Sequence, residues 1–405
     1  MRHFFLLFFF AVLASTSWAQ KITLSGRVID KETKEPLPFA TLGIKAKALG
    51  TITNLQGEFD FHIPGELRND LFVITMLGYK AYEAPVWTLL DIKNLVIELE
   101  KSTYLLDEVT IADTLRGGDV LVIALSRIEQ NYPMQPYLLE GFYRDLKKVG
   151  GTYIALLEAA VKIYDEDYKE PRNKFKLRER VALQEVRRSI GYASRFTTYF
   201  DQDNLLEDLL LHNSVRYRHF PLEEVFYSSL KREADTYYND QPVFVVSYTG
   251  EYHLRAYVEK KNFAIIRLEF ENDQQEALTK KRGLESRFVG LTRVLEFKPF
   301  QGRYYLNYLK VDSKINWYEI RTGELKFETE LNQYLLVNDI VPNTIRRVAT
   351  TEKMRNYGLQ YQDKPYNKEF WDNYNVIKES PLDKKILQDL ERHGPLEKQF
   401  KDHQF

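Results

Sequence analysis

The sequence predicts a mainly β protein, α+β overall, in which an N-terminal β-sandwich precedes a larger antiparallel β-meander or half-barrel domain with accessory helices. Apolar and polar side chains alternate in short runs across residues 22–100, as in half-buried strands. Longer alternating runs, separated by turn residues, return between residues 243 and 336. The chain also contains 27 Tyr and 25 Phe, which commonly fill β cores as cross-strand pairs.

The first residues are typical of a secretory signal peptide. Met1-Arg2-His3 is a short basic start, an apolar run follows, and Ser17-Trp18-Ala19 fits a small-x-small cleavage site. Because that run is shorter than the roughly 20 residues that span a bilayer, we expect residues 1–19 to be removed, which leaves no transmembrane span. The chain has no cysteine, which excludes a lipoprotein anchor and disulfides. We therefore predict export to the periplasm or to the periplasmic face of the outer membrane.

Charge and length narrow the class of protein further. The chain has 57 basic and 58 acidic residues among 405, with a formal net charge of -1. Nucleic-acid binding needs clustered, uncompensated Lys and Arg, so nucleic acid is not an expected partner. A chain of this length favours two domains.

Residues 20–101 form the first predicted domain. Phe59, Phe61 and Ile63 alternate with polar residues and so place their side chains on one face of a strand. Gly57 supplies a turn conformation that other residues rarely adopt. About seven short strands with frequent turns predict a β-sandwich.

Four motifs in this block carry a family resemblance. They are Gly26-x-Val28-x-Asp30, Pro36-Leu37-x-x-Ala40, Gly50-Thr51-x-Thr53-Asn54-x-x-Gly57-x-Phe59 and Gly78-Tyr79. The block resembles the carboxypeptidase-regulatory-like domain, a transthyretin/prealbumin-like sandwich of exported Bacteroidota proteins and of TonB-dependent receptors. Asn54 stands where the family more often has Asp, a change that keeps the turn-forming chemistry. The resemblance implies a non-catalytic accessory module.

Residues 102–136 are predicted to link the two domains. Leu105-Leu106-Asp107-Glu108-Val109-Thr110-Ile111 is similar to a segment that follows this module in TonB-dependent receptors, and we expect a strand or linker here. Between Gly117 and Tyr132 the apolar residues fall at helical spacing, and Pro133 ends the predicted helix.

Residues 137–350 form the predicted larger domain. Segments 243–248, 253–258 and 264–270 predict consecutive antiparallel strands, and 287–297, 304–317 and 325–336 extend the meander. Residues 175–233 are charged and are expected to be a mostly helical insertion, whereas Asp165-Glu166-Asp167 is expected to be a solvated turn. The tail, residues 351–405, contains a predicted amphipathic helix from Pro381 to Leu390.

Two further likenesses concern the larger domain. Phe142-Tyr143-Arg144 and Phe370-Trp371 resemble parts of an uncharacterised two-domain family of exported Bacteroidota proteins. The meander is also similar in strand pattern to the half-barrel of periplasmic lipoprotein carriers. The second likeness implies a cavity for a lipid.

The sequence contains no complete catalytic or metal-binding pattern, so we predict no catalytic residue, no metal site and no cofactor. A zinc peptidase site needs His-x-x-Glu or His-Glu-x-x-His, and neither occurs. His212 and His219 are seven residues apart and could share a helix face, but we expect solvated or capping roles. Ser228-Ser229-Leu230-Lys231 matches Ser-x-x-Lys without its companion motifs. Asp201-Gln202-Asp203-Asn204 lacks the Gly and the final Glu of a calcium loop and is read as a helix cap.

One basic cluster is a candidate contact site. Arg178, Arg180, Arg187 and Arg188 lie within eleven residues and are balanced in part by neighbouring acids, as on a solvated helix face. Their functional alternative is contact with anionic lipid phosphates at the outer membrane. We therefore expect a non-enzymatic cell-envelope protein whose partners are outer-membrane components, lipid or glycan. The alternatives are a lipid or lipoprotein carrier and an enzyme with an unrecognised site.

Overall fold

The computed structural model describes most of the chain after the leader. The described residues are 21–102, 114–200, 205–354, 358–362, 364–378 and 383–402. The predicted signal peptide and the segments Leu105–Ile111 and Asp201–Asn204 lie outside them.

The predicted N-terminal sandwich is confirmed, with two sheets in the orders β4-β1-β7 and β3-β2-β5-β6. Its strands are β1 (Lys21–Asp30), β2 (Thr41–Ile44), β3 (Gly50–Ile52), β4 (Glu58–Pro64), β5 (Leu71–Thr75), β6 (Tyr82–Pro85) and β7 (Leu95–Leu99). Short 3-10 turns cover Gly65–Asn69 and Val86–Thr88. The alternation read from the sequence is the cause of this fold, because Phe59, Phe61 and Ile63 all lie in the core between the sheets.

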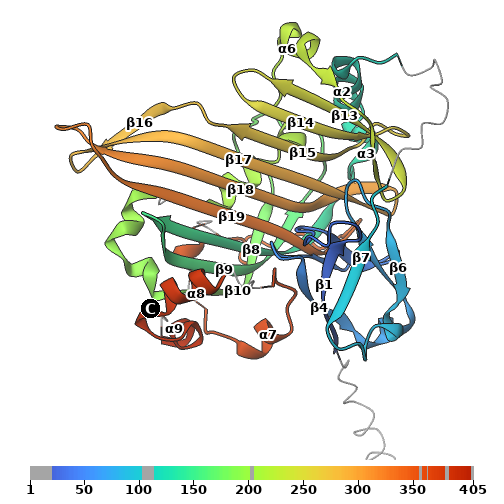
Figure 1. The fold of residues 1–405 in the computed structure, drawn as a ribbon, viewed down its shortest axis with the longest axis horizontal. Coiled ribbons are helices and arrows are strands. Elements are labelled where there is room, and N and C mark those ends of the chain that lie inside the picture. Colours follow the sequence, from blue (N-terminus) through green and yellow to red (C-terminus); the bar gives the residue numbers. More distant parts are fainter. Residues whose placement is uncertain are drawn as a thin grey trace, which may run out of the picture.

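The larger domain is built on one open sheet of 12 strands (Figure 1). The strands are β8 (Tyr137–Val149), β9 (Thr152–Asp165), β10 (Arg180–Arg188), β11 (Lys231–Arg232), β12 (Thr236–Tyr238), β13 (Gln241–Thr249), β14 (His253–Glu259), β15 (Ile265–Asn272), β16 (Glu276–Lys281), β17 (Leu284–Phe300), β18 (Arg303–Glu319) and β19 (Leu325–Val341). Neighbours follow the order β10-β9-β8-β19-β18-β17-β15-β14-β13-β11. The predicted antiparallel meander is thus confirmed from β13 to β19. Its last strand then pairs with β8, which joins the two ends of the domain's sequence.

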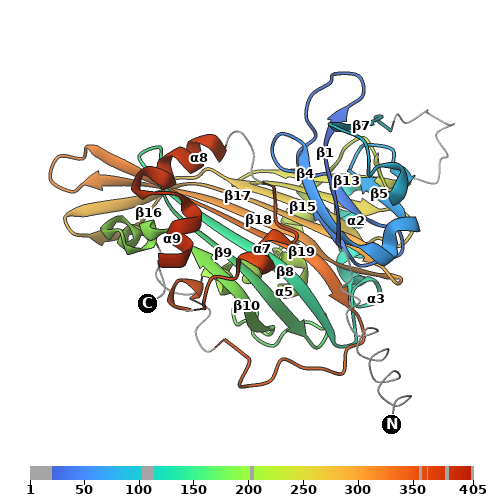
Figure 2. The same ribbon diagram turned by 90° about the horizontal axis from the view of Figure 1, so that it is seen from below.

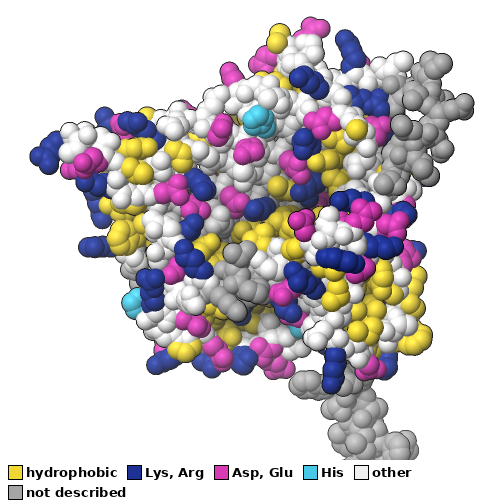
Figure 3. All heavy atoms as spheres, in the orientation of Figure 1, with side chains coloured by type: hydrophobic (Ala, Val, Ile, Leu, Met, Phe, Trp, Pro, Cys, Tyr) yellow, Lys and Arg dark blue, Asp and Glu magenta, His cyan; other side chains and the backbone are white. Residues whose placement is uncertain are grey.

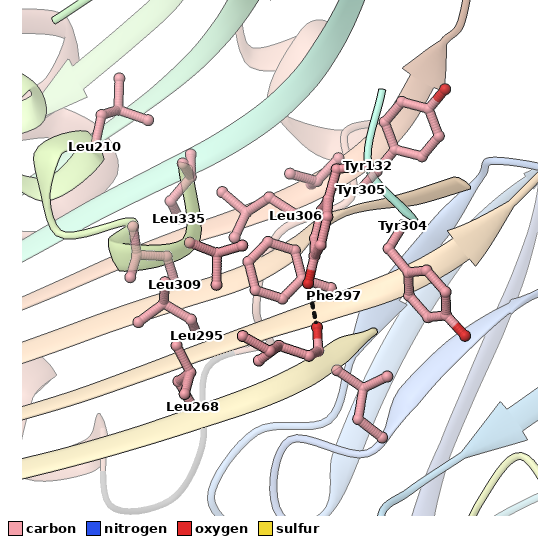
Figure 4. Packing of buried hydrophobic residues seen from close by; sticks show 14 of the residues in the cluster. Tyr132, Leu210, Leu268, Leu295, Phe297, Tyr304, Tyr305, Leu306, Leu309 and Leu335 are labelled. Carbon is pink, nitrogen blue, oxygen red and sulfur yellow. Dashed lines mark hydrogen bonds between the residues drawn. The ribbon is translucent and has the colours of Figure 1, made fainter. Parts of the chain in front are cut away.

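Helices cover one face of this sheet, which we call the helical face. They are α2 (Gly117–Ser126), α3 (Ile128–Asn131), α4 (Leu205–Leu211), α5 (Ser214–Tyr217) and α6 (Glu224–Ser229). On four adjacent strands, Leu268, Leu295, Leu309 and Leu335 stand opposite one another in register. Figure 4 shows Leu210 of α4 near this row, and all five residues belong to one buried cluster. In this region, apolar side chains therefore fill the space between the sheet and the helices.

The interval 175–233 departs from its mostly helical prediction. Its first part is the strand β10, which pairs with β9 at one edge of the sheet. The side chains of β10 alternate between the two faces of the sheet only on either side of a bulge after Leu183, so a helical reading of this Arg- and Glu-rich sequence misses the strand. The remainder contains two 3-10 segments, Ile190–Ala193 and Arg195–Tyr199, followed by α4, α5 and α6.

The sandwich and the C-terminal tail lie against the opposite face, which we call the sandwich face (Figure 2). The tail contains the 3-10 segments Leu359–Tyr361 and Glu391–His393 and the helices α7 (Lys368–Asp372), α8 (Asp383–Leu390) and α9 (Leu396–Asp402). The predicted tail helix corresponds to α8, although Pro381 and Leu382 lie outside the described residues. Ile52 of the sandwich and Trp371 of α7 share one apolar cluster with Phe142 and Leu336 of the sheet.

Candidate binding groove at the domain junction

Buried polar contacts join the sandwich to the large sheet. The Thr41 hydroxyl donates to a Glu296 carboxylate oxygen at 3.0 Å, and the Asn307 amide donates to the Thr41 hydroxyl at 2.9 Å. All three residues are buried. Because buried polar groups that lose their partners are costly, these contacts fix one position of the sandwich on the sheet.

The tail adds a second connection to the same sandwich. The side-chain amide of Asn375 accepts the backbone N–H of His62 at 2.8 Å and donates to the His62 carbonyl at 3.1 Å. Lys378 forms an ion pair with Asp60 at 2.9 Å. Asn375 therefore pairs with β4 as a neighbouring strand would.

A groove lies where these three parts meet, and we call it the junction groove. Its volume is about 320 Å³, which is within the size range of small-ligand sites. The sandwich contributes Phe39, Asn54 and Leu55; the sheet contributes Arg144, Leu146, Tyr153, Lys310, Asp312, Glu330, Asn332 and Tyr334; the tail contributes Ile377, Lys378, Lys385 and Ile386. Figure 3 shows apolar side chains among charged ones where the sandwich meets the sheet.

Phe39 has a strained backbone in this groove. Its φ is 60°, in the left-handed region that a bulky side chain rarely adopts. The loop holds it there, because the Phe39 N–H donates to the Thr53 carbonyl at 3.1 Å and the Thr53 hydroxyl donates to the Leu37 carbonyl at 2.7 Å. Such strain costs about 1–3 kcal/mol and clusters at ligand sites. The motif residues of the sandwich thus set the position of an aromatic ring in the groove.

Polar side chains surround the aromatic rings. The Lys310 ammonium lies 5.6 Å from the Phe39 ring centroid and 5.8 Å from that of Tyr334, and it pairs with Asp312 at 2.7 Å. The Asn332 amide donates to the other Asp312 oxygen at 2.9 Å. The groove therefore offers flat apolar rings beside donors and acceptors that are already oriented.

A buried carboxylate supports the floor beneath Arg144. Glu158 is fully buried between Arg144 and Arg187, at 2.6 Å and 2.5 Å. Burial would raise its pKa, but the two guanidinium groups hold the pKa of Glu158 below its ordinary value. Arg187 also lies over the Trp371 ring at 4.4 Å. This network holds Arg144 and Arg187 in place beneath the groove.

The four predicted lipid-contact arginines are not brought to one surface. Arg187 is bound to Glu158, and the buried Arg188 donates to the Gln362 carbonyl at 2.6 Å. Arg180 is half-buried and donates to the Val348 carbonyl at 2.7 Å, whereas Arg178 is 30% exposed. Lipid contact remains a prediction, and it concerns mainly Arg178 and Arg180.

The predicted solvated turn at Asp165-Glu166-Asp167 is wrong for Asp165, where a buried ion pair lies, whereas Glu166 is exposed. Arg216 of α5 is fully buried and holds both Asp165 oxygens, at 2.5 and 3.1 Å. Burial and the nearby Asp165 raise the pKa of Glu179 to about 7, and Tyr217 donates a hydrogen bond to it. No local pattern indicates that an arginine 51 residues away reaches Asp165.

Other candidate patterns remain without catalytic companions. Among the described residues, no group of three or more His, Asp or Glu side chains is arranged to hold a metal ion. Ser228 lies in α6 and donates to the Val225 carbonyl, as a helical serine does. In the same described part of the chain, no helix has the length and apolar character needed to cross a bilayer.

The sequence matches to known proteins concern the sandwich domain. Residues 24–111 match the family model of the CarboxypepD_reg-like domain. The TonB-dependent receptor SusC of Bacteroides thetaiotaomicron is 32% identical over 99 residues, which are 24% of this chain and 9% of the receptor. This chain therefore spans less than a tenth of that curated relative. The family resemblance read from the four motifs is confirmed for the N-terminal domain.

Solved structures give only distant likenesses. The Pseudomonas aeruginosa MucA/MucB complex covers 56% of this chain and 99% of its own, at 9% identity and a TM-score of 0.18. The lipovitellin match covers 59% of this chain and 28% of the lipovitellin chain, at 11% identity and a TM-score of 0.23. The match to a membrane-associated protein of unknown function from Bacteroides fragilis covers 79% of this chain and 98% of that protein's chain, at 10% identity and a TM-score of 0.16. These TM-scores are too low for a shared fold to follow.

Proposed function

We propose that this protein is a non-catalytic binding protein of the bacterial cell envelope that holds a glycan in the junction groove. The matched domain is regulatory-like, and the partial match to an outer-membrane receptor is compatible with a periplasmic location. The accessory sandwich supplies one wall of the groove, and the β-rich domain supplies the floor.

The strained Phe39 is the observation that carries this proposal. A ring held at a cost of about 1–3 kcal/mol, beside a second ring and an oriented Lys310–Asp312 pair, is typical of a binding site. Sugar rings have apolar faces and hydroxyl edges, so flat aromatic surfaces beside polar side chains are complementary to them. A lipid carrier would need a hollow sheet face, and the packed leucine row beneath α4 favours the groove instead.

The test compares two glycines placed at matched positions. Phe39 and Phe263 both have φ near 60°, but Phe263 lies in the β14–β15 turn, away from the groove. Labelled wild-type protein, Phe39→Gly and Phe263→Gly are applied to an array of bacterial envelope glycans. We expect wild type and Phe263→Gly to bind the same glycans, and Phe39→Gly to bind them at least about tenfold more weakly, the equivalent of 1.4 kcal/mol.

Three results would contradict the proposal. They are an array without a bound glycan, equal binding by Phe39→Gly, and cleavage of the bound glycan by the wild-type protein. Glycine tolerates positive φ, so both variants are expected to fold, which circular dichroism checks.

A further inference from the structure

A second site lies on the helical face of the large sheet, opposite the junction groove. There Arg293 of β17 lies over the Phe270 ring, with its guanidinium carbon 4.5 Å from the ring centroid. Its Nη1 donates to Nδ1 of His212, at the end of α4, at 3.2 Å. Its Nε is buried and has no hydrogen-bond partner.

No carboxylate balances this arginine. Among the described residues, neither Asp nor Glu forms an ion pair with Arg293, although Arg216, Arg187 and Arg267 each have one. Burial lowers the pKa of Arg293 to about 10, and only Tyr252 opposes this effect. A buried cation without a counter-ion is expensive, so such a site favours an anion that arrives from outside.

The neighbouring histidines are also free of acids. Burial, together with Arg293 and His219, lowers the pKa of His212 to about 4, so its ring is neutral at pH 7. Because Nδ1 of His212 accepts a hydrogen bond from Arg293, the neutral ring carries its own proton on Nε2. The pKa of His219 is lowered as well, mainly by burial. Nε2 of His219 is hydrogen-bonded to the Lys174 carbonyl at 2.8 Å, so this ring forms part of the wall, and Arg293 and Ser214 are the groups that can donate to an anion.

Ser214 supplies a further unpaired group. Its hydroxyl oxygen is buried without a partner, and Ser214, His219 and Arg293 line one small cavity. The cavity volume is about 40 Å³, which exceeds the ~10–15 Å³ that one water needs by the same measure. Two residues that each carry an unpartnered polar atom therefore line one cavity that is large enough for a small polar group.

We propose that Arg293 and Ser214, in the cavity that His219 also lines, form a binding site for a small oxyanion, the phosphate or carboxylate group of a solute or of a lipid headgroup. Arg293 neutralises and orients the anion through its planar fork of N–H donors, and the Ser214 hydroxyl completes the contact. This site is independent of the glycan proposed for the junction groove, because it lies on the other face of the sheet.

Calorimetric titration of the full mature chain tests the site. Inorganic phosphate and acetate are the soluble probes, and sedimentation with phosphatidylglycerol–phosphatidylcholine vesicles tests a lipid source. We expect Arg293→Gln to weaken binding at least about tenfold, the equivalent of about 1.4 kcal/mol, because the substitution removes the charged hydrogen-bond donor. Arg287→Gln is the matched control, because Arg287 lies on the same strand, is 43% exposed and pairs with Glu285. Ser214→Ala is expected to weaken binding as well, with little effect on folding.

The outcomes distinguish a soluble oxyanion from a lipid headgroup and show whether the site exists. Binding of phosphate or acetate that Arg293→Gln abolishes identifies a soluble oxyanion, and binding of vesicles alone with the same loss identifies a lipid headgroup. Absence of binding to all three probes overturns the site, as does binding that Arg293→Gln and Ser214→Ala leave unchanged. Arg293→Gln is expected to unfold at the wild-type temperature or above it in ligand-free buffer, because it removes an unpaired buried charge.

Discussion

Lys298 connects the two domains through a buried ammonium, and its titration tests the rigid junction. The residue is half-buried, and its Nζ donates to the Ala48 carbonyl of the sandwich at 3.0 Å and to the Val337 carbonyl of β19 at 3.4 Å. Burial lowers the pKa of Lys298 from 10.5 to about 8, and Asp339 opposes this shift in part. The protonated form is therefore disfavoured by folding.

The sign and the size of the effect follow from proton linkage. Below pH 8 both the folded and the unfolded chain hold the proton, so the folded protein bears the full cost. Between pH 8 and 10.5 the unfolded chain binds more protons, so the free energy of unfolding rises with pH. The full shift corresponds to ~3.4 kcal/mol, of which ~2.5 kcal/mol falls between pH 7 and pH 10, and partial exposure reduces this part to about 2 kcal/mol.

The assay is urea unfolding of wild type, Lys298→Met and the exposed control Lys93→Met at pH 7 and pH 10. Comparing each variant with wild type cancels the titration of all other groups. We expect wild type to gain about 2 kcal/mol on Lys298→Met over this range, and Lys93→Met to follow wild type. Parallel profiles for wild type and Lys298→Met would refute a buried ammonium at the junction.

Three further substitutions test the parts of the fold that position the groove, each by urea unfolding. Gly57 has φ of 71°, and a Cβ there would lie 2.3 Å from the Val28 carbonyl oxygen, so Gly57→Ala should lower the free energy of unfolding by ~2 kcal/mol or more. The control Gly150→Ala should lower it by less, because the space around Gly150 is open. Leu309→Ala should cost ~2–5 kcal/mol, and the exposed Leu325→Ala less than ~0.5 kcal/mol; equal losses would contradict the packed helical face. Asn375→Ala should lower the free energy of unfolding by ~1–3 kcal/mol and speed hydrogen exchange of the His62 backbone amide, which donates to Asn375. Unchanged exchange would contradict a contact between the tail and the sandwich at this position.

Local patterns predicted the strands of this protein well because side-chain alternation is a property of neighbouring residues. Phe59, Phe61 and Ile63 show on which face of their strand the core lies. Charged β10 was mistaken for helix because its apolar residues, such as Val181 and Val186, are few and a bulge after Leu183 interrupts its alternation.

The site could not be predicted in this way because its residues are distant in sequence. Phe39 and Tyr334 come from different domains, and only folding brings both to the groove. Aromatic and charged residues are common in β proteins, so neither residue is distinctive by itself. The Pro36-Leu37-x-x-Ala40 motif was the one available signal, since Phe39 lies within it, but a positive φ at Phe39 depends on the hydrogen bond to Thr53.

Hydrogen exchange with and without a glycan that the array identifies tests the central claim most directly. The groove is built from three parts, namely the sandwich loops, the sheet and the tail. The account predicts that protection increases together in residues 36–55, in β19 and in the tail around Ile377 and Lys378. Protection confined to one of these parts, or to the helical face, would contradict a ligand site at the domain junction.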